Sequence, residues 1–176
     1  MNTIKITSGR LRGRSIGSPN LKTTHPMGAR EKLALFNMIA DYLPGANVLD
    51  TYAGSGALGI EALSRGAKYA MFVEKNARAA AMIRKNLTEL GLLECAGVSE
   101  WDAKNFLPAE NFDIIIADPP YDNFELSGIE NLAKFLKEGG VFVLSHPGDA
   151  PKISGLKLLK TRRYAAAQIS IYTRAS

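Results

Sequence analysis

The chain has 176 residues, of which 46% are hydrophobic and 22% charged, a balance typical of one globular domain. Its one cysteine excludes a disulfide framework within the chain, and the lack of an apolar run of about 18 residues argues against a membrane span. The net charge of +5 is uneven, since residues 1–32 carry seven Lys and Arg against one acid, whereas the other 144 residues carry 15 basic and 16 acidic side chains.

Localised positive charge at the start of a chain is typical of a protein that binds nucleic acid. The first residues lack the apolar core of a signal peptide, and the lone Cys95 fits a reducing compartment. We therefore expect a cytoplasmic protein without a membrane partner.

Residues 3–16 predict a small β-hairpin. Ile4 and Ile6 alternate with polar neighbours as in a strand, Ser8-Gly9 predicts a turn, and residues 11–16 can return as a second strand. Three arginines would then share one face, because strand side chains alternate with a period of two. That face suits a phosphate backbone better than it suits a merely solvated edge strand, because balancing acids are missing. The three arginines are Arg10, Arg12 and Arg14.

Segments that alternate between helical and strand patterns follow a loop at residues 17–28. Helices are expected at residues 29–42, 58–66, 76–90 and 126–136, the last ended by Gly139-Gly140. Strands are expected at residues 48–50, 69–73, 95–99, 113–117, 141–144, 156–164 and 167–172. This alternation predicts an α/β domain with a seven-stranded, mainly parallel sheet whose terminal hairpin leaves one strand antiparallel. We therefore expect a basic hairpin and loop at residues 1–28 and the α/β domain at residues 29–176.

A glycine-rich turn follows the first strand of this domain. Ala53-Gly54-Ser55-Gly56 leads straight into a helical pattern, where glycines allow close approach of a ligand and the helix start offers unpaired N–H groups. The spacing Gly54-x-Gly56-x-x-Gly59 matches the dinucleotide fingerprint, although a purely geometric turn would show it as well. A small polar or charged cofactor is expected at this turn.

Acidic side chains stand at the ends of four successive predicted strands. These are Asp50, Glu74, Asp102 and Asp118. Ligands of open α/β sheets bind outside the carboxyl ends of the strands, where Glu74 can accept both ribose hydroxyls. Asp102, with Ala103, can meet the exocyclic amine of an adenine. These features fit NAD and S-adenosylmethionine equally well.

The motif Asp118-Pro119-Pro120-Tyr121 distinguishes the two cofactors. The prolines lack backbone donors, so neighbouring carbonyls can point into a pocket as acceptors beside the carboxylate and the ring. Such a site suits a planar base with an exocyclic amine, which stacks on the ring while acceptors hold its N–H groups. Hydride transfer from nicotinamide needs nothing of this kind, whereas methylation of an amine does.

These motifs resemble those of class I S-adenosylmethionine-dependent methyltransferases that methylate amines. The whole chain is similar to the small-subunit ribosomal RNA guanine-N2 methyltransferases (the RsmD type). The features that carry the likeness are residues 6–14, Pro26, Leu35-Phe36-Asn37, residues 53–66 and the motif at 118–121.

The resemblance implies a Rossmann-like methyltransferase fold, S-adenosylmethionine as cofactor, and ribosomal RNA within a small-subunit particle as substrate. Transfer of a sulfonium methyl group needs no metal, and a monomer is expected for a basic face that must meet a large RNA. The implied cofactor-binding residues are Pro26, Asp50, Ala53, Gly54, Ser55, Gly56, Glu74, Asp102, Ala103 and Asp118. The implied catalytic residues are Asp118, Pro119, Pro120 and Tyr121, and the implied RNA contacts are Arg10, Arg12, Arg14 and Arg30.

The chain departs from the family pattern before its first helix. His25 stands where the family has Arg, Ala29 where it has an acid, and Leu33 where it has Glu. These departures bear on the target nucleotide more than on the cofactor. Two alternatives stay open: adenine-N6 methylation of DNA or RNA, and a non-catalytic RNA-binding or assembly protein on the same scaffold.

Overall fold

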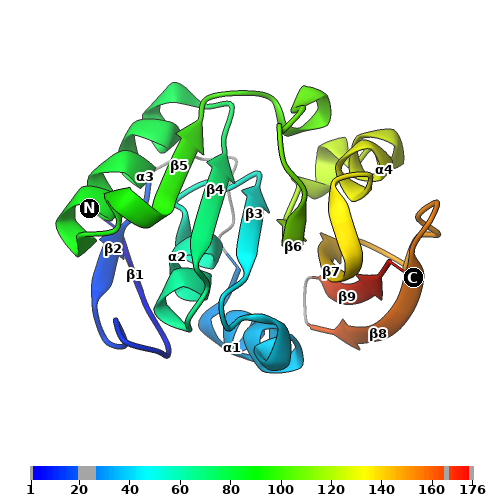
Figure 1. Cartoon of the computed structure of the whole chain (residues 1–176), viewed down its shortest axis with the longest axis horizontal. Helices are drawn as coiled ribbons and strands as arrows, with labels where there is room; N and C mark the ends of the chain where they lie inside the picture. The colour runs from blue at the N-terminus through cyan, green and yellow to red at the C-terminus, as the bar shows by residue number, and fades with distance from the viewer. Residues whose placement is uncertain (1, 20–26, 165–166, 175–176) are drawn as a thin grey trace.

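A computed structural model describes residues 2–19, 27–164 and 167–174 of the chain (Figure 1). The main sheet consists of β3 (Asn47–Thr51), β4 (Tyr69–Val73), β5 (Ala96–Ser99), β6 (Phe112–Ala117), β7 (Leu136–His146), β8 (Lys157–Arg163) and β9 (Gln168–Thr173). Its strand order is β5-β4-β3-β6-β7-β9-β8. A separate two-stranded sheet pairs β1 (Thr3–Lys5) with β2 (Ser15–Gly17).

Most strands of the main sheet run parallel, as the sequence predicts. The pairs β3–β4, β3–β6, β4–β5 and β6–β7 are parallel, whereas β9 runs antiparallel to both β7 and β8. The last strand of the chain therefore lies inside the sheet, and β8 forms its edge. The prediction of a seven-stranded sheet with one antiparallel strand from a terminal hairpin is confirmed.

Helices cover both faces of the sheet. They are α1 (Ala29–Met38), α2 (Ala57–Ser64), α3 (Ala77–Leu90) and α4 (Leu126–Ala133), with short 3₁₀ turns at Ala40–Tyr42, Leu93–Cys95, Ala103–Asn105 and Tyr121–Asn123. The first three helices pack on one face in a cluster with Val48, Phe72 and Ile114. On the other face α4 packs with Leu49 and Ile115. Neighbouring strand residues thus alternate between two cores, as period-two side chains require.

The N-terminal arginines do not share one face of a strand, contrary to the prediction from residues 11–16. Residues 8–13 form turns, and β2 begins only at Ser15. The backbone N–H of Arg10 donates to the Ser64 carbonyl (2.8 Å), and the N–H of Leu11 donates to the Ser64 hydroxyl (3.0 Å). The C-terminal end of α2 therefore holds this segment as a turn, and the backbone groups are not free to pair as a strand.

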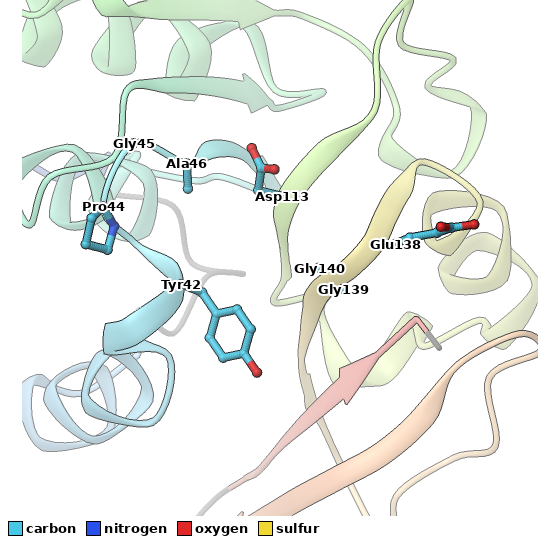
Figure 2. Close-up of a pocket in the computed structure, with 8 residues that line it drawn as sticks. All are labelled: Tyr42, Pro44, Gly45, Ala46, Asp113, Glu138, Gly139 and Gly140. Carbon is cyan, nitrogen blue, oxygen red and sulfur yellow. The ribbon is translucent and has the colours of Figure 1, made fainter. Parts of the chain in front are cut away.

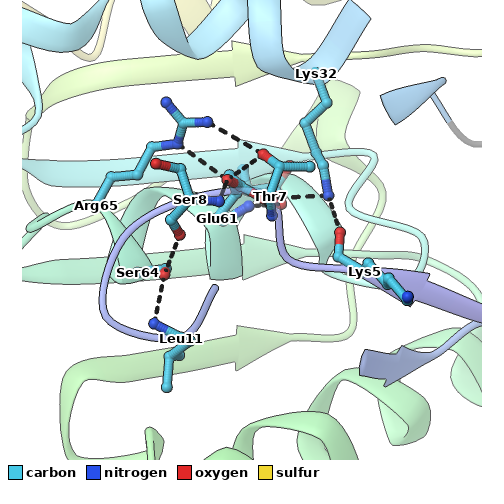
Figure 3. Close-up of polar contacts among 10 residues, drawn as sticks. Lys5, Thr7, Ser8, Leu11, Lys32, Glu61, Ser64 and Arg65 are labelled. Carbon is cyan, nitrogen blue, oxygen red and sulfur yellow. Dashed lines mark hydrogen bonds and ion pairs between the residues drawn. The ribbon is translucent and has the colours of Figure 1, made fainter. Parts of the chain in front are cut away.

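A buried ion cluster fixes the same N-terminal segment to the helices (Figure 3). The Glu61 carboxylate of α2 accepts hydrogen bonds from the Thr7 N–H (3.0 Å) and hydroxyl (2.6 Å) and from the Ser8 N–H (3.0 Å). It also pairs with Lys32 of α1 (3.2 Å) and with Arg65 (3.0 Å), and its side chain is fully buried. Burial alone would raise the pKa of Glu61, but these donors and cations lower it below its usual value.

Gly139-Gly140 does not end a helix, as the sequence had indicated. The helix α4 ends at Ala133, and β7 already begins at Leu136, which pairs with Phe112 of β6. The register then shifts, so that Val141 pairs with Ile114. The two glycines therefore belong to an irregular part of a long strand, where a bulge needs residues without a side chain.

The chain reverses its direction of winding at β3. It runs from β3 outward to β4 and β5, and then returns to β6 on the other side of β3. Ligands of open α/β sheets bind at such a switch point, outside the carboxyl ends of the strands. Among the described helices none has the length and apolar character that crossing a bilayer would require.

Candidate active site

A cavity of about 670 Å³ opens at the carboxyl ends of the parallel strands. The segments after β3, β4 and β6 line it, together with Ala103 and with Ser145 near the end of β7. Glu31 and Lys32 of α1 lie on one side of it, and Ala167 and Ile169 lie on the side of β9. The fold thus brings the predicted glycine turn and the predicted motif at residues 118–121 into one cavity.

The glycine turn is held by two carboxylates. The Gly54 N–H donates to Glu74 Oε2 (2.8 Å), and the Asn76 N–H donates to Glu74 Oε1 (2.8 Å). The Gly59 N–H donates to Asp50 Oδ2 (2.8 Å), and a Cβ at Gly59 would lie 2.3 Å from the Phe72 ring. The close packing of α2 on the sheet therefore requires a glycine at position 59. The Asp50 carboxylate holds the first turn of α2 by accepting this hydrogen bond.

Tyr52 was not predicted as a site residue. It lines the cavity just before the glycine turn, and its φ of 58° is the only positive φ among the described non-glycine residues. Burial, with the charges of Asp102 and Glu125, raises the pKa of Tyr52 to about 12. Left-handed backbone at a bulky residue costs free energy and is found mainly at functional sites. Only the structure reveals it, because sequence alone gives no sign of such a conformation.

Asp118 follows β6 directly and faces the same cavity. Burial, and secondarily the charge of Glu31, raises the pKa of the Asp118 carboxyl to about 6, although a hydrogen bond with Ser145 counters part of this rise. The carboxyl therefore titrates much closer to neutral pH than an ordinary aspartate does. Pro119 is buried and Pro120 is exposed, and both line the cavity.

Ser145 joins the two polar side chains of the motif. Its hydroxyl lies 2.6 Å from the Tyr121 hydroxyl, and it is hydrogen bonded to Asp118 as well. Ser145 is 2% exposed, so this bridge is shielded from bulk water. Sequence reasoning missed Ser145, because a serine within a long apolar strand carries no motif.

Several predicted cofactor residues line the cavity, and others lie behind it. Those on its wall are Ala53, Gly54, Ser55, Glu74, Ala103 and Asp118, whereas Asp50, Gly56 and Asp102 are not among its lining residues. Gly56 is the N-cap of α2, with a φ of 78°, and Asp102 caps the turn that contains Ala103. The prediction for Pro26, like the departure at His25, lies outside the described residues.

The predicted RNA contacts lie on the surface near the N-terminus. Arg10, Arg12, Arg14 and Arg30 are all exposed. Among them, Arg14 donates to the Glu89 carbonyl (3.2 Å), while no ion pair holds any of the four in the described part of the chain. Their guanidinium groups are therefore available to an anionic partner.

The donor set of the cavity suits an organic cofactor and a planar base. A carboxylate at Glu74 has lone pairs left for hydroxyl donors, and the glycine turn leaves open space at Gly54, whose nearest neighbour to an added Cβ is 4.0 Å away. The carboxyl of Asp118 and the ring of Tyr121 lie together on the opposite part of the wall. No cluster of three metal-ligating side chains occurs among residues 2–19, 27–164 and 167–174.

A smaller cavity of about 230 Å³ lies at the opposite end of the strands (Figure 2). Tyr42, Asp113 and Glu138 line it, and Figure 2 shows that their polar ends do not converge. Asp113 is already paired with Lys137 (3.0 Å) and accepts from the Asn47 N–H (2.8 Å). Because Asp113 is satisfied within the protein and does not converge with Glu138, this cavity is the weaker candidate.

Comparisons with known proteins agree with this geometry. A model of the protein family described as conserved hypothetical protein 95 matches residues 4–173. The chain is 32% identical to ribosomal RNA small subunit methyltransferase D of Haemophilus influenzae, over 96% of this chain and 93% of that one. It is 34% identical to the protein of that name from Escherichia coli, over 78% and 68% of the two chains. It is similar to the solved structure "Putative methyltransferase yhhF from Escherichia coli", with a TM-score of 0.89, 29% identity and 99% of each chain covered.

Proposed function

The chain belongs to the conserved hypothetical protein 95 family, and from this premise we propose that it transfers a methyl group from S-adenosylmethionine to the exocyclic N2 of a guanine in small-subunit ribosomal RNA. The observation that carries the proposal is the meeting of the glycine turn and the motif at residues 118–121 in one cavity. The relatives named as ribosomal RNA small subunit methyltransferases support the substrate class.

The cofactor fits the wall formed by the segments after β3 and β4. We assign the ribose hydroxyls to Glu74, the amino-acid part to the turn at residues 53–56, and the adenine to the region of Asp102 and Ala103. When bound there, the cofactor supplies an electrophilic methyl group on a positively charged sulfur. The glycines permit close approach of the backbone, and the start of α2 contributes its N–H groups.

The motif at residues 118–121 holds the target amine. The Asp118 carboxylate and the Pro119 carbonyl accept the two N–H groups of the amine, while the guanine stacks on the Tyr121 ring. These acceptors direct the nitrogen lone pair toward the methyl group, so positioning supplies most of the rate gain. As the N–C bond forms, the S–CH3 bond would break and leave the neutral thioether S-adenosylhomocysteine. Asp118 stabilises the positive charge that passes to the nitrogen until a proton leaves to water.

The N-terminal segment contributes to RNA binding in this proposal. We propose residues 1–28 as the RNA-contacting part of the chain and residues 29–176 as the methyltransferase domain. Arg10, Arg12, Arg14 and Arg30 would bind phosphates, as their exposure permits. We further propose that the protein is a cytoplasmic monomer that acts on RNA within a small-subunit particle.

The proposal is tested by methyl transfer from labelled S-adenosylmethionine to small-subunit RNA and particles from cells that lack this protein. Nucleoside digestion should yield N2-methylguanosine with the wild type and with the exposed control variant Asp41→Ala, but not with Asp118→Ala. N6-methyladenosine would instead establish the adenine alternative. Cofactor binding without transfer to any nucleic acid would favour a non-catalytic scaffold.

Ser145 is expected to position Asp118 and Tyr121 rather than to touch the substrate. Ser145→Ala should lower kcat by about 2- to 10-fold, the range of one hydrogen bond. In the wild type the hydrogen bond from Ser145 lowers the pKa of Asp118. Its loss should therefore raise that pKa and move the acid limb of the pH profile to higher pH. Ser145→Thr, which keeps the hydroxyl, should restore both quantities. A pH profile unchanged by Ser145→Ala would contradict this role.

A further inference from the structure

Positive charge is not confined to the N-terminal segment. Residues 151–176 carry six Lys and Arg and no acidic residue, whereas residues 33–150 carry nine basic and 16 acidic side chains. The near-neutral balance of the chain after residue 32 therefore hides a second basic segment as strong as the first. Four of its six cations, Lys157, Lys160, Arg162 and Arg163, belong to β8.

The strand β8 presents these cations at the open edge of the sheet. Only β9 pairs with β8 in the main sheet (Figure 1). All four basic side chains are exposed. In the part of the chain that the structure describes, none of the four takes part in an ion pair. By contrast, Lys32, Arg65, Lys104 and Lys137 are all paired with acids. The charge of β8 is therefore available to a partner.

The register of β8 places two of its cations on the face of the sheet that α1 covers. Arg162 pairs with Ile169 and Lys160 pairs with Ile171, after a bulge at Leu159. Residues directly opposite in an antiparallel pair project to the same face. Ile169 lines the large cavity, and both isoleucines belong to the core on the face covered by α1. Lys160 and Arg162 consequently lie on the cavity face of the sheet edge.

Two elements that border the cavity, α1 and the β8–β9 pair, carry exposed cations next to lining residues. Glu31 and Lys32 of α1 line it on the N-terminal side, next to the exposed Arg30, and Ile169 lines it on the β8 side. A base that enters the cavity from an RNA strand carries backbone phosphates on both its 5′ and 3′ sides. Exposed cations on two elements beside the cavity are suited to bind these phosphates.

We propose that β8 is a second RNA-binding surface, on which Lys160 and Arg162 bind backbone phosphates beside the cavity. This inference rests on the proposed function and identifies a contact that the family motifs do not include. RNA is favoured over other anionic partners because the surface borders the cavity that must receive a nucleobase.

The test uses the full chain, a labelled small-subunit ribosomal RNA transcript and a salt titration. Lys160→Gln with Arg162→Gln should raise the Kd about tenfold or more at 0.1 M salt. It should lower the slope of log K against log salt by about 2, roughly one for each lost phosphate contact. The matched control, Lys68→Gln with Lys134→Gln, removes the same charge from exposed lysines elsewhere, for which the described part of the chain shows no ion pair, and should change Kd less than about twofold.

Methyl transfer separates this inference from the proposed function. The β8 double variant should raise the KM for RNA more than it lowers kcat, with unchanged thermal stability and unchanged affinity for S-adenosylhomocysteine. Charge reversal, Lys160→Glu with Arg162→Glu, should weaken binding further. A wild type that methylates RNA while the β8 variants bind like the control would overturn the β8 surface alone. A wild type that neither binds nor methylates RNA would overturn both proposals.

Discussion

Asp118→Asn is expected to lower kcat for methyl transfer by about 10²- to 10³-fold, the usual cost of removing one group that stabilises developing charge in a closed site. The amide keeps one acceptor but offers no negative charge to the nitrogen that receives the methyl group. The measurement is single-turnover transfer from labelled S-adenosylmethionine at saturating RNA, which separates chemistry from binding. Affinity for S-adenosylhomocysteine should stay within a few-fold of wild type.

The same carboxyl sets the acid limb of the wild-type pH profile. Burial raises the pKa of Asp118 to about 6, so kcat should fall as pH falls through about 6, where the carboxylate becomes protonated. The profile of Asp118→Asn should be flat in that window. A wild-type rate that stays constant down to pH 5 would show that ionised Asp118 is not needed for transfer.

The substitution Asp118→Asn should lower activity without lowering thermal stability. Because the folded-state pKa lies above the ordinary value of 3.9, the folded protein binds more protons than the unfolded chain between about pH 4 and 6. The ionised carboxyl thus opposes folding increasingly as pH rises through that window, and the opposition is complete above it. At pH 7.5 Asp118→Asn should therefore melt at the same or a higher temperature than wild type. A lower melting temperature would indicate a structural role instead.

Local patterns were sufficient to predict the sheet and most of its helices. The glycine turn, the acids at strand ends and the motif at residues 118–121 lie in contiguous segments, and period-two and period-3.6 patterns position them on a parallel sheet. The structure confirms the predicted fold and shows that these segments line or support one cavity. The role of each residue in the cavity stays a prediction.

Features that depend on distant contacts could not be predicted in this way. The Ser64 groups that hold residues 10 and 11 as a turn are more than 50 positions away, so the pattern at residues 11–16 indicated a strand. Ser145 of β7 contacts Tyr121, which lies in the turn after β6 and 24 positions away, so only the folded structure shows this contact. The strand register likewise decides which cations of β8 face the cavity. In each case tertiary contact, rather than local propensity, determines the outcome.

Glu61→Ala should destabilise the protein by about 3–5 kcal/mol, because it leaves the buried ammonium of Lys32 without its counterion. Lys32 would keep only the Lys5 carbonyl (2.8 Å) as acceptor, and the N–H groups of Thr7 and Ser8 would lose theirs. Urea unfolding at pH 7 measures the effect. Glu89→Ala, which removes an exposed i,i+4 pair with Lys85, should cost less than about 1 kcal/mol.

The loss of unfolding free energy caused by Glu61→Ala should depend on pH and on the presence of Lys32. The pKa of Glu61 is lowered in the folded protein, so its stabilising contribution is present above the unfolded-state value of about 4.3 and is lost as pH falls through the folded-state pKa.

Glu61→Leu combined with Lys32→Met should cost less than Glu61→Ala alone, because no lysine charge is then left buried without its counterion. Hydrogen exchange at Thr7 and Ser8 should accelerate in both variants, since these amides bond to Glu61. If exchange accelerates there without a change in global stability, the ion cluster serves to attach the N-terminal segment, and the arginines that we propose as RNA contacts depend on it for their position.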